Sequence, residues 1–444
     1  MKKVLIANRG EIAVRVIRAC KELGLRTVAI HSTVDKDSLH AKLADESICI
    51  GPGPSIHSYL SIPAIMSAAE VAGVDAIHPG YGFLAENAEF AHVSQEYGIK
   101  FIGPTANHIN LLGNKVRARE LAKKIGVPLL PGSDGVLRDV KTAIETAERI
   151  GYPVIIKAAA GGGGRGMKIV HDPKDMATQF AIAQSEAQTC FGNSDCFMEK
   201  YLTAPRHVEV QLMADEHGTC VYLGERDCSM QRRHQKVLEE SPCPVLNDVE
   251  RKYVGSQAVA LAKEVGYQSL GTAEFLYQDG KFYFMEMNTR VQVEHPVTEM
   301  VTGIDLIKEQ ILIAQGKRIE PKTYKARGHS MECRINAEDP NTFAPWPGLI
   351  TAYHEPGGIG VRMDSMIYTG YQVPSLYDSM IAKVITFGRD RSECIARMRR
   401  ALGEMKVDGI RTNISFHLRL LSDERFIKND ISTAYMAEFL TRSK

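Results

Sequence analysis

The sequence predicts a protein of two or three domains that begins with a doubly wound parallel-sheet domain (α/β) and continues as α+β structure. The 444-residue chain is too long for one hydrophobic core. Roughly the first 110 residues alternate short β-rich runs with helical patterns, which is typical of a parallel sheet with helices on both faces. The stretches from about 207 to 293 and after about 320 are rich in strand-forming runs.

In the first domain, short apolar runs predict parallel strands and one periodic stretch predicts a helix. The helix is expected over residues 11–23. The strands are expected at 4–7, 27–30, 47–50 and 75–77. The loop 79–82 follows the last of these strands, at the end where open α/β sheets bind ligands.

Changes in pattern along the chain suggest three domains. We expect an N-terminal α/β domain at 1–113, a second domain at 114–320 with a mobile, glycine-rich lid at about 131–202, and a β-rich C-terminal domain at 321–444. Further helical patterns lie within the second and third domains, at 115–125, 391–405 and 414–421.

The composition excludes several classes of protein. The 54 basic and 53 acidic residues balance, so no general attraction to nucleic acid or to an anionic membrane follows. No apolar run reaches the length of a membrane span, and the short apolar start indicates a first strand rather than a signal peptide. The nine scattered cysteines lack any C-x-x-C spacing, which argues against a disulfide framework and a zinc site. We therefore expect a cytoplasmic protein.

The most informative stretch carries a polar side chain at every second position. These residues are Glu286, Asn288, Arg290, Gln292 and Glu294. In an extended chain, alternate side chains share one face, so that face would hold two carboxylates, two amides and a guanidinium. The solvated face of a half-buried strand usually carries Lys, Thr and Ser instead. The mixture therefore favours a ligand-binding face.

A second acid, Glu274, precedes this stretch, and Asp279-Gly280 between them predicts a hairpin. A two-residue turn would send Glu274 and Glu286 to opposite faces, whereas a three-residue loop at 278–280 would place them on one face. We expect the three-residue loop. Carboxylates so placed repel each other unless a cation lies between them, and Mg²⁺ held by few carboxylates and by nucleotide phosphates fits that demand.

A lysine and a glycine run suggest phosphate binding. Lys157 ends the apolar run 154–156, just before the glycines of 161–164. Bare backbone amides there could wrap phosphate oxygens, although a lone glycine run is more often a surface turn. The run lacks the G-K-[ST] ending of a P-loop, and Asn8-Arg9-Gly10-Glu11 has too few glycines for a dinucleotide-binding loop.

Three other features have ordinary structural interpretations on their residues alone. The basic run 231–236 is typical of a solvated edge. His207, in an alternating run, is typical of a structural histidine. Cys228 has no convincing base beside it, so we expect a buried, inert thiol.

Seven stretches taken together resemble the biotin carboxylase family of ATP-grasp enzymes, over essentially the whole chain. They lie at 6–13, 78–84, 161–167, 226–229, 286–290, 293–296 and 333–339. The resemblance implies an ATP-grasp fold and ATP-dependent carboxylation of biotin by bicarbonate through carboxyphosphate. It also implies the first half-reaction of acetyl-CoA carboxylase, which leads to malonyl-CoA and fatty acid synthesis. Ala160 is a small departure, because relatives often carry glycine there.

The resemblance further implies a role for each candidate residue. Those implied to bind ATP are Lys115, Lys157, Gly163 and Gly164 of the lid, the hinge Glu199, Lys200, Tyr201 and Leu202, and His207 and His234. Those implied to hold Mg²⁺ or Mn²⁺ are Glu274, Glu286 and Asn288. Those implied to hold bicarbonate are Lys236, Arg290 and Val293. Glu294 would remove the proton of bicarbonate, and Arg334 would face biotin and stabilise its enolate oxygen.

The family's partners are a biotin carboxyl carrier protein and carboxyltransferase subunits, and its members pair as homodimers. We expect no biotin on this chain, because Glu404-Met405-Lys406-Val407 resembles an attachment turn only weakly. One rival is another ATP-grasp ligase, which activates a carboxylate for attack by an amine and would cleave ATP without stimulation by biotin. Another is a non-catalytic nucleotide-binding subunit, against which the intact set of charged site residues argues.

Overall fold

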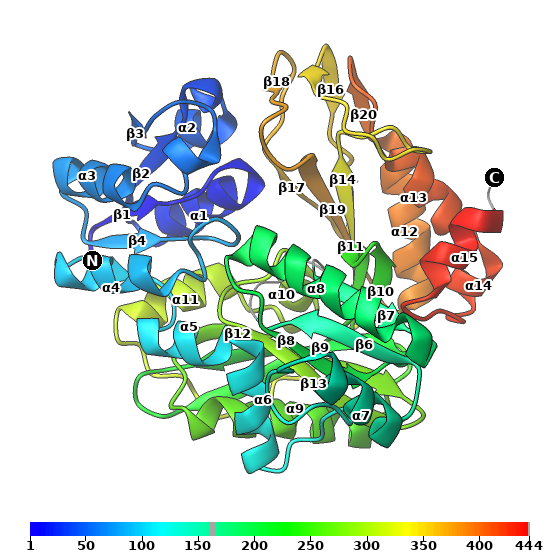
Figure 1. The fold of residues 1–444 in the computed structure, drawn as a ribbon. Helices are drawn as coiled ribbons and strands as arrows, with labels where there is room; N and C mark the ends of the chain where they lie inside the picture. Colours follow the sequence, from blue (N-terminus) through cyan, green and yellow to red (C-terminus); the bar gives the residue numbers. More distant parts are fainter. Residues whose placement is uncertain (160–165, 443–444) are drawn as a thin grey trace.

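The computed structural model describes residues 1–159 and 166–442, and its three regions follow one another along the chain (Figure 1). The N-terminal region is a five-stranded parallel sheet in the order β3-β2-β1-β4-β5. Its strands are β1 (Lys3–Ile6), β2 (Arg26–His31), β3 (Glu46–Cys49), β4 (Ala76–His78) and β5 (Lys100–Phe101). The four predicted strands are confirmed; β5 has two residues and leaves no apolar run to detect.

Helices cover both faces of this sheet, as a doubly wound fold requires. They are α1 (Gly10–Glu22), α2 (Leu39–Leu43), α3 (Ile62–Ala72), α4 (Ala88–Glu96) and α5 (Ala106–Leu112). Val4 and Ile6 of β1 pack in one core with α1, whereas Leu5 between them packs in another with α3 and α4. Alternate side chains of one strand therefore enter two separate cores.

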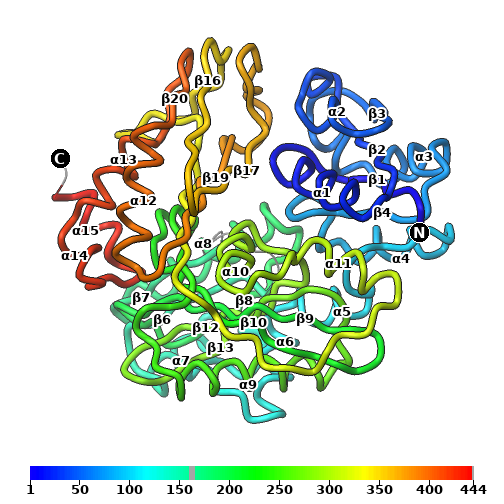
Figure 2. Tube along the Cα trace, turned by 180° about the vertical axis from the view of Figure 1, so that it is seen from behind, coloured from blue at the N-terminus to red at the C-terminus, as the bar shows by residue number. Residues whose placement is uncertain are grey.

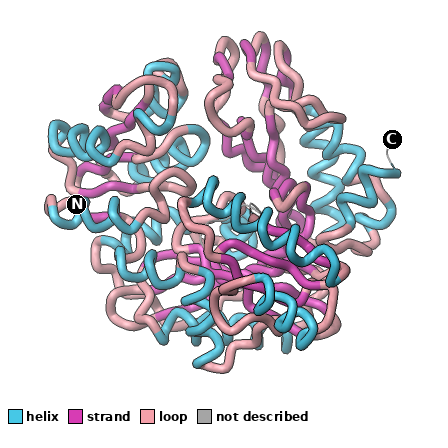
Figure 3. Tube along the Cα trace, in the orientation of Figure 1, coloured by secondary structure: helices cyan, strands magenta, loops and turns pink. Residues whose placement is uncertain are grey.

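The largest element is an eight-stranded antiparallel sheet in the order β13-β12-β9-β10-β11-β14-β19-β17. Its strands are β9 (Arg206–Ala214), β10 (Cys220–Arg232), β11 (Gln235–Ser241), β12 (Ser269–Gln278), β13 (Lys281–Asn288), β14 (His329–Asn336), β17 (Val361–Ser365) and β19 (Met380–Gly388). Because β11 pairs with β14, the sheet runs without a break from the central region into the C-terminal region (Figure 3).

A separate three-stranded sheet, in the order β7-β6-β8, lies against the central region (Figure 1). Its strands are β6 (Val154–Ala158), β7 (Met167–Val170) and β8 (Cys196–Lys200), and its helices are α7 (Val140–Ile150) and α8 (Met176–Phe191). It has its own small core, to which Ile156, Phe180 and Met198 belong. This unit occupies most of the predicted lid segment.

The remaining helices cover the antiparallel sheet. They are α6 (Lys115–Lys124), α9 (Asp248–Glu264), α10 (His295–Thr302), α11 (Leu306–Ala314), α12 (Arg391–Glu404), α13 (Ile414–Leu420), α14 (Glu424–Ile427) and α15 (Tyr435–Arg442). Helices α10 and α11 lie between α1 and the sheet (Figure 2). The helices predicted at 115–125, 391–405 and 414–421 are confirmed within one residue. Among the described helices, none combines the length and the apolarity needed to cross a bilayer.

Short strands complete the C-terminal region. They are β15 (Gly348–Leu349), β16 (Ala352–His354), β18 (Gln372–Val373) and β20 (Lys406–Asp408). Lys406 pairs with His354 in the β16–β20 ladder. The stretch that weakly resembles a biotin-attachment turn is therefore the end of a helix followed by a strand.

The hairpin between β12 and β13 differs from the prediction. Asp279 and Gly280 have φ values of 52° and 74°, and Gln278 pairs with Lys281. This is a two-residue turn with both central residues left-handed, the conformation that Asp-Gly favours. The predicted three-residue loop is therefore wrong.

A β-bulge in β13 nevertheless brings the two acids to one face. Phe275 of β12 pairs with Phe284 of β13. The residue before Phe275, Glu274, pairs with Glu286. Met285 is therefore an extra, unpaired residue in β13. One extra residue on one strand reverses the side-chain alternation beyond it. The predicted placement of Glu274 and Glu286 on one face is thus confirmed, although by a bulge and not by the loop.

Replacing Phe284 by Ala should destabilise the protein by about 3–5 kcal/mol. The ring is fully buried and meets Phe275 edge-on at a centroid distance of 5.8 Å. Urea unfolding would measure the change in the free energy of unfolding. Val249→Ala is the control, because that side chain is 78% exposed and its loss should change stability by less than about 0.5 kcal/mol. Equal effects of the two substitutions would contradict the assignment of this core.

Candidate active site

Two adjoining cavities, of about 530 Å³ and about 1260 Å³, lie where the small sheet, the antiparallel sheet and the loops of the parallel sheet meet. Residues that line both include Lys157, Met167, His207, Gln231, His234 and Met285. The loop 79–82 contributes Tyr81 and Gly82 to the larger cavity. That loop therefore faces a cavity at the carboxyl end of β4, as the sequence predicts.

Most predicted site residues line these cavities. Those in the smaller cavity are Lys157, Lys200, Tyr201, Leu202, His207 and His234. Those in the larger cavity include Lys115, Lys157, His207, His234, Lys236, Glu274, Glu286, Asn288, Arg290, Val293 and Arg334. Glu199 and Glu294 are buried behind the walls. Gly163 and Gly164 lie outside the described residues.

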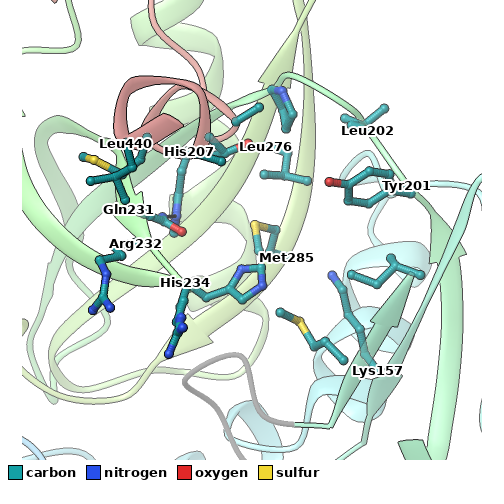
Figure 4. Close-up of a pocket in the computed structure, with 18 of the residues that line it drawn as sticks. Lys157, Tyr201, Leu202, His207, Gln231, Arg232, His234, Leu276, Met285 and Leu440 are labelled. Atoms are coloured by element: carbon teal, nitrogen blue, oxygen red, sulfur yellow. Dashed lines mark hydrogen bonds between the residues drawn. The ribbon is translucent and has the colours of Figure 1, made fainter. Parts of the chain in front are cut away.

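Apolar side chains form one wall of the smaller cavity, and polar and charged ones line the rest (Figure 4). Leu276 and Met285 of the antiparallel sheet lie between Tyr201 on one side and His207 on the other (Figure 4). Ile155 of β6 also lines it. An apolar wall of this kind suits the face of a flat aromatic ring system.

The segment between β8 and β9 offers one unused backbone donor to this cavity. The Lys200 N–H donates to the Pro131 carbonyl at 2.7 Å, and the Tyr201 N–H donates to the Pro153 carbonyl at 3.1 Å. No protein acceptor for the Leu202 N–H occurs within residues 1–159 and 166–442. A half-buried donor of this kind is available to the edge of a ligand ring.

An ion-pair triad holds Lys157, whose side chain reaches into the smaller cavity (Figure 4). Its Nζ lies 2.5 Å from Glu199 Oε2, and the other Glu199 oxygen pairs with Arg119 of α6. The Glu199 side chain is therefore committed to the two cations, so only its backbone can face a ligand. Sequence reasoning missed Arg119, because its helix carries no motif.

Glu274 is the centre of a hydrogen-bonded group in the larger cavity. Its Oε2 lies 3.0 Å from His207 Nε2, and its Oε1 lies 3.1 Å from Lys236 Nζ. Asn288 and Gln292 also donate to Oε1, at 2.8 and 3.0 Å. Burial alone would raise the pKa of Glu274, but Lys236 and His207 outweigh it and hold that pKa well below its usual value. The group is an ionised carboxylate.

The oxygen donors of Glu274, Glu286 and Asn288 fit a hard divalent cation. Glu274 and Glu286 are direct cross-strand partners, and all three residues line the same cavity. Glu286 Oε2 lies 2.5 Å from Lys115 Nζ, so an ammonium now neutralises each acid. A divalent cation among these oxygens would take over that neutralisation.

Lys236 connects three buried carboxylates. Its Nζ donates to Glu209 Oε2 at 2.6 Å, to Glu274 Oε1 at 3.1 Å and to Glu294 Oε1 at 2.6 Å. Burial alone would lower the pKa of Lys236, but the three carboxylates raise it well above its usual value. The ammonium is therefore fully charged.

Arg334 holds the other oxygen of Glu294. Its Nη2 donates to Glu294 Oε2 at 2.9 Å, and its Nε donates to Glu239 Oε1 at 2.7 Å. Burial would raise the pKa of Glu294, but Lys236, Arg334 and the nearby Arg226 hold it well below its usual value. Both oxygens of a fully buried carboxylate are thus paired with cations, at the edge of a cavity.

Arg290 is held by a residue that the sequence did not suggest. Its Nε donates to Glu86 Oε2 at 2.8 Å, and its Nη2 donates to Asn288 Oδ1 at 3.1 Å. Glu86 also accepts from the Thr289 N–H at 3.0 Å. Glu86 lies just beyond the loop 79–82, so that loop was the available signal for it. The partnership joins the parallel-sheet region to the antiparallel sheet.

The alternating face extends only part of the way that the sequence predicts. Strand β13 ends at Asn288, and Glu294 is the N-cap of α10 with φ −82° and ψ 10°. The predicted extended chain over 286–294 is therefore wrong beyond Asn288. The side chains that follow the strand still converge on one site, namely those of Arg290, Gln292 and Glu294. They do so because a turn brings them back over the strand, and not because they lie on one face of an extended chain.

The basic run 231–236 lines both cavities, and its middle residues, 233–235, are solvent-exposed as its charge suggests. Gln231 Nε2 lies 2.6 Å from His207 Nδ1, and the Arg232 guanidinium stacks over Phe343 at 3.9 Å. Cys228 is fully buried, as predicted, and burial raises its pKa well above the usual value.

One carboxyl beside this site has no partner. Glu332, the cross-strand neighbour of Glu239, is fully buried, and neither of its oxygens has a hydrogen-bond partner among the described residues. Burial raises its pKa well above the usual 4.5, and the charges of Glu239 and Glu294 add to the effect of burial, while Lys383 and Arg334 oppose it. Glu332 therefore binds its proton more tightly in the folded protein than in the unfolded chain.

Glu332→Gln should remove a pH dependence of stability. Because the pKa of Glu332 is higher in the folded protein than in the unfolded chain, its protonation stabilises the fold. That contribution is complete below pH 4.5 and declines as the pH rises toward the pKa of Glu332 in the folded protein. Glutamine does not titrate, so relative to the wild type the variant should gain up to about 1.4 kcal/mol per pH unit above pH 4.5. Urea unfolding at several pH values measures this difference, and parallel stability curves for the two proteins would contradict it.

Comparisons with known proteins agree with this architecture. Residues 1–109 match the model "Biotin carboxylase, N-terminal domain", residues 114–322 match "Carbamoyl-phosphate synthase L chain, ATP binding domain", and residues 332–438 match "Biotin carboxylase C-terminal domain". The biotin carboxylase of Pseudomonas aeruginosa is 55% identical, over 100% of both chains.

Two solved structures have closely similar folds. A biotin carboxylase–beta-gamma-ATP complex from Campylobacter jejuni gives a TM-score of 0.97 at 50% identity and covers 98% of each chain. The biotin carboxylase domain dimer of Hydrogenobacter thermophilus 2-oxoglutarate carboxylase, a complex with MgADP, ADP and bicarbonate, gives 0.95 at 47% identity over 98% of this chain and 97% of that chain. With its parallel-sheet and antiparallel-sheet regions arranged as in these ATP-grasp structures, the chain belongs to the biotin carboxylase family.

Proposed function

We propose that this protein carboxylates biotin on a carrier protein, using bicarbonate and ATP, through carboxyphosphate. One observation carries the proposal: the buried carboxylate of Glu294 lies between Lys236 and Arg334, next to the cavity that also holds Glu274 and Glu286. A base, cationic groups for an anion and oxygen donors for a metal thus meet in one place. The family relatives with MgADP and bicarbonate, and with an ATP analogue, support the same assignment.

ATP would occupy the smaller cavity with its phosphates directed toward the larger one. The adenine ring fits between Leu276, Met285 and Ile155, and the Leu202 N–H is free to donate to its edge. Lys157 and Lys115 would then lie along the phosphates. We retain as a proposal that Gly163 and Gly164, which lie outside the described residues, bind these phosphates, because bare backbone amides can bind phosphate oxygens.

Glu274, Glu286 and Asn288 would hold Mg²⁺ or Mn²⁺. The metal supplies positive charge to the phosphate oxygens during phosphoryl transfer. Lys115 and Lys236 would then be released from these acids and become available to the phosphates and to bicarbonate.

Bicarbonate would bind Lys236, Arg290 and the backbone at Val293, with Glu294 as its base. The low pKa of Glu294 in the present arrangement comes from Lys236 and Arg334. An anion that competes for Lys236 weakens that stabilisation and so raises the proton affinity of Glu294. Binding of the substrate would therefore itself prepare the base.

Arg334 would face biotin. After carboxyphosphate divides into CO₂ and phosphate, phosphate takes the proton from N1 of biotin. The enolate oxygen that develops needs a fixed cation beside it, and the ion pair with Glu239 holds the Arg334 guanidinium rigidly.

We further propose that the final acceptor is acetyl-CoA, so that the protein supplies malonyl-CoA for fatty acid synthesis. This proposal rests on the family resemblance of the sequence, and the relative from a 2-oxoglutarate carboxylase shows that family members serve other acceptors too. The proposed partners are a biotin carboxyl carrier protein, carboxyltransferase subunits and a second copy of this chain. We retain the domains 1–113, 114–320 and 321–444 and a cytoplasmic location as proposals.

The purified protein should release ADP from ATP only when Mg²⁺, bicarbonate and free biotin are all present. Each omission removes a reactant or a charge that the site needs. A coupled ADP assay measures the rate, with the chelated, bicarbonate-free and biotin-free mixtures as controls. ADP release that ignores biotin would instead favour a ligase that joins a carboxylate to an amine.

Glu294→Gln should reduce biotin carboxylation by about a hundred- to ten-thousand-fold, because glutamine keeps the shape of the side chain but cannot accept a proton. The KM for ATP should change little, since the nucleotide lies in the other cavity. Glu309→Gln is the matched control. Glu309 is on α11, pairs with Lys317 just beyond the end of that helix, and lines neither cavity. Near wild-type carboxylation by the Glu294 variant, or loss of ATP binding instead, would leave Glu294 as a positioning residue only.

A further inference from the structure

A buried lysine lies behind the wall that carries Val293 and Glu294. Lys383 of β19 is fully buried, and its Nζ donates to the Val293 carbonyl at 2.8 Å. The same ammonium lies 3.2 Å from Glu11 Oε1 and 4.0 Å from Asp364 Oδ2. Its partners thus come from α1, from β17 and from the turn before α10, which are distant in the sequence.

Glu11 fixes this lysine from the parallel-sheet region. It is in the first turn of α1, is 3% exposed, and its Oε1 also accepts a hydrogen bond from the Tyr81 hydroxyl. Tyr81 lines the larger cavity. Glu11 lies in one of the stretches that carry the family resemblance, and no role in the chemistry has yet accounted for it.

The Lys383 contact sets the orientation of one peptide group. Because a trans peptide is planar, a Val293 carbonyl that faces Lys383 directs the Glu294 N–H to the opposite side. Neither the Val293 nor the Glu294 N–H has a protein acceptor in the described part of the chain. Both donors therefore stay available at the start of α10, directly beside the proposed base.

We propose that Lys383, held by Glu11, is a positioning residue for the bicarbonate site, which it shapes by fixing the Val293–Glu294 peptide. It touches no substrate and acts through the Val293 carbonyl. This inference rests on the proposed function. It predicts that loss of the lysine impairs the use of bicarbonate more than the use of ATP, whose cavity lies elsewhere.

If the Lys383–Glu11 ion pair only stabilised the fold, its removal would not affect the use of bicarbonate selectively. A double variant separates this structural role from the positioning role. Lys383→Met alone leaves Glu11 buried without its cation, which is strongly destabilising, whereas replacing both partners of a buried pair is often neutral for stability. In Glu11→Gln/Lys383→Met, the pair is gone and Asp364 keeps Arg362 as its partner at 2.8 Å. The Val293 carbonyl then loses its donor, and Glu332 loses one of the charges that lower its pKa.

The test measures thermal stability and steady-state kinetics of the wild type and the double variant with free biotin. We expect near wild-type stability, an unchanged KM for ATP, and a fall in kcat/KM for bicarbonate of about a hundredfold, the effect typical of a small misplacement of reacting groups. Lys383→Arg, which keeps a cation there, should recover part of that loss. The matched control is Glu240→Gln/Arg391→Met, which removes another ion pair, at 2.7 Å, between the buried Glu240 of β11 and the half-buried Arg391 at the start of α12, without touching Val293. Its bicarbonate kinetics should stay at the wild-type level.

Two failures are distinguishable. If the wild type shows no ADP release that depends on bicarbonate and biotin, the proposed function is wrong and this inference is overturned with it. If the wild type is active and the Glu11/Lys383 double variant uses bicarbonate normally, or is impaired no more than the Glu240/Arg391 control, the positioning role is overturned while the proposed function remains.

Discussion

The ammonium of Lys236 is the interaction on which the rest of the site depends. A buried carboxylate without a partner is costly, and here Glu209, Glu274 and Glu294 share one cation. The three acids come from β9, from β12 and from the start of α10. The cation is on β11, so the ladder that joins these strands must be in register before the charges can neutralise one another. Packing and electrostatics thus require the same arrangement of strands.

Much of the fold could be predicted because local patterns determine it. Apolar runs predicted four of the five strands of the parallel sheet, and helical periodicity predicted α6, α12 and α13 to within a residue. The hairpin between β12 and β13 shows the limit of prediction from local sequence patterns. Asp279-Gly280 favours a two-residue turn, as observed, but the bulge at Met285 depends on packing across the sheet and has no signal in the sequence.

The residues of the candidate site also fall into a part that the sequence predicts and a part that it does not. Residue types gathered in short stretches, such as Glu286 to Glu294, could be recognised as chemistry. Their partners could not, because Glu86 and Arg290 are 204 residues apart and Glu239 and Arg334 are 95 apart. Nothing local predicts which acid will lie beside which base once the strands pair. For the same reason the charge of the run 231–236 predicted its solvent exposure at 233–235 but not the cavities that the run lines.

The unbroken sheet limits how this molecule can open. Strand β11 of the central region and β14 of the C-terminal region are joined by the ladder that pairs Glu239 with Glu332. A hinge rotation between those two regions would have to break that ladder and separate Arg334 from Glu239. Among the described residues, the three-stranded sheet that carries Lys157 shares no ladder with them. The proposed carrier would therefore reach the site by displacement of that small unit and of surface loops, while the groups around Glu294 kept their spacing.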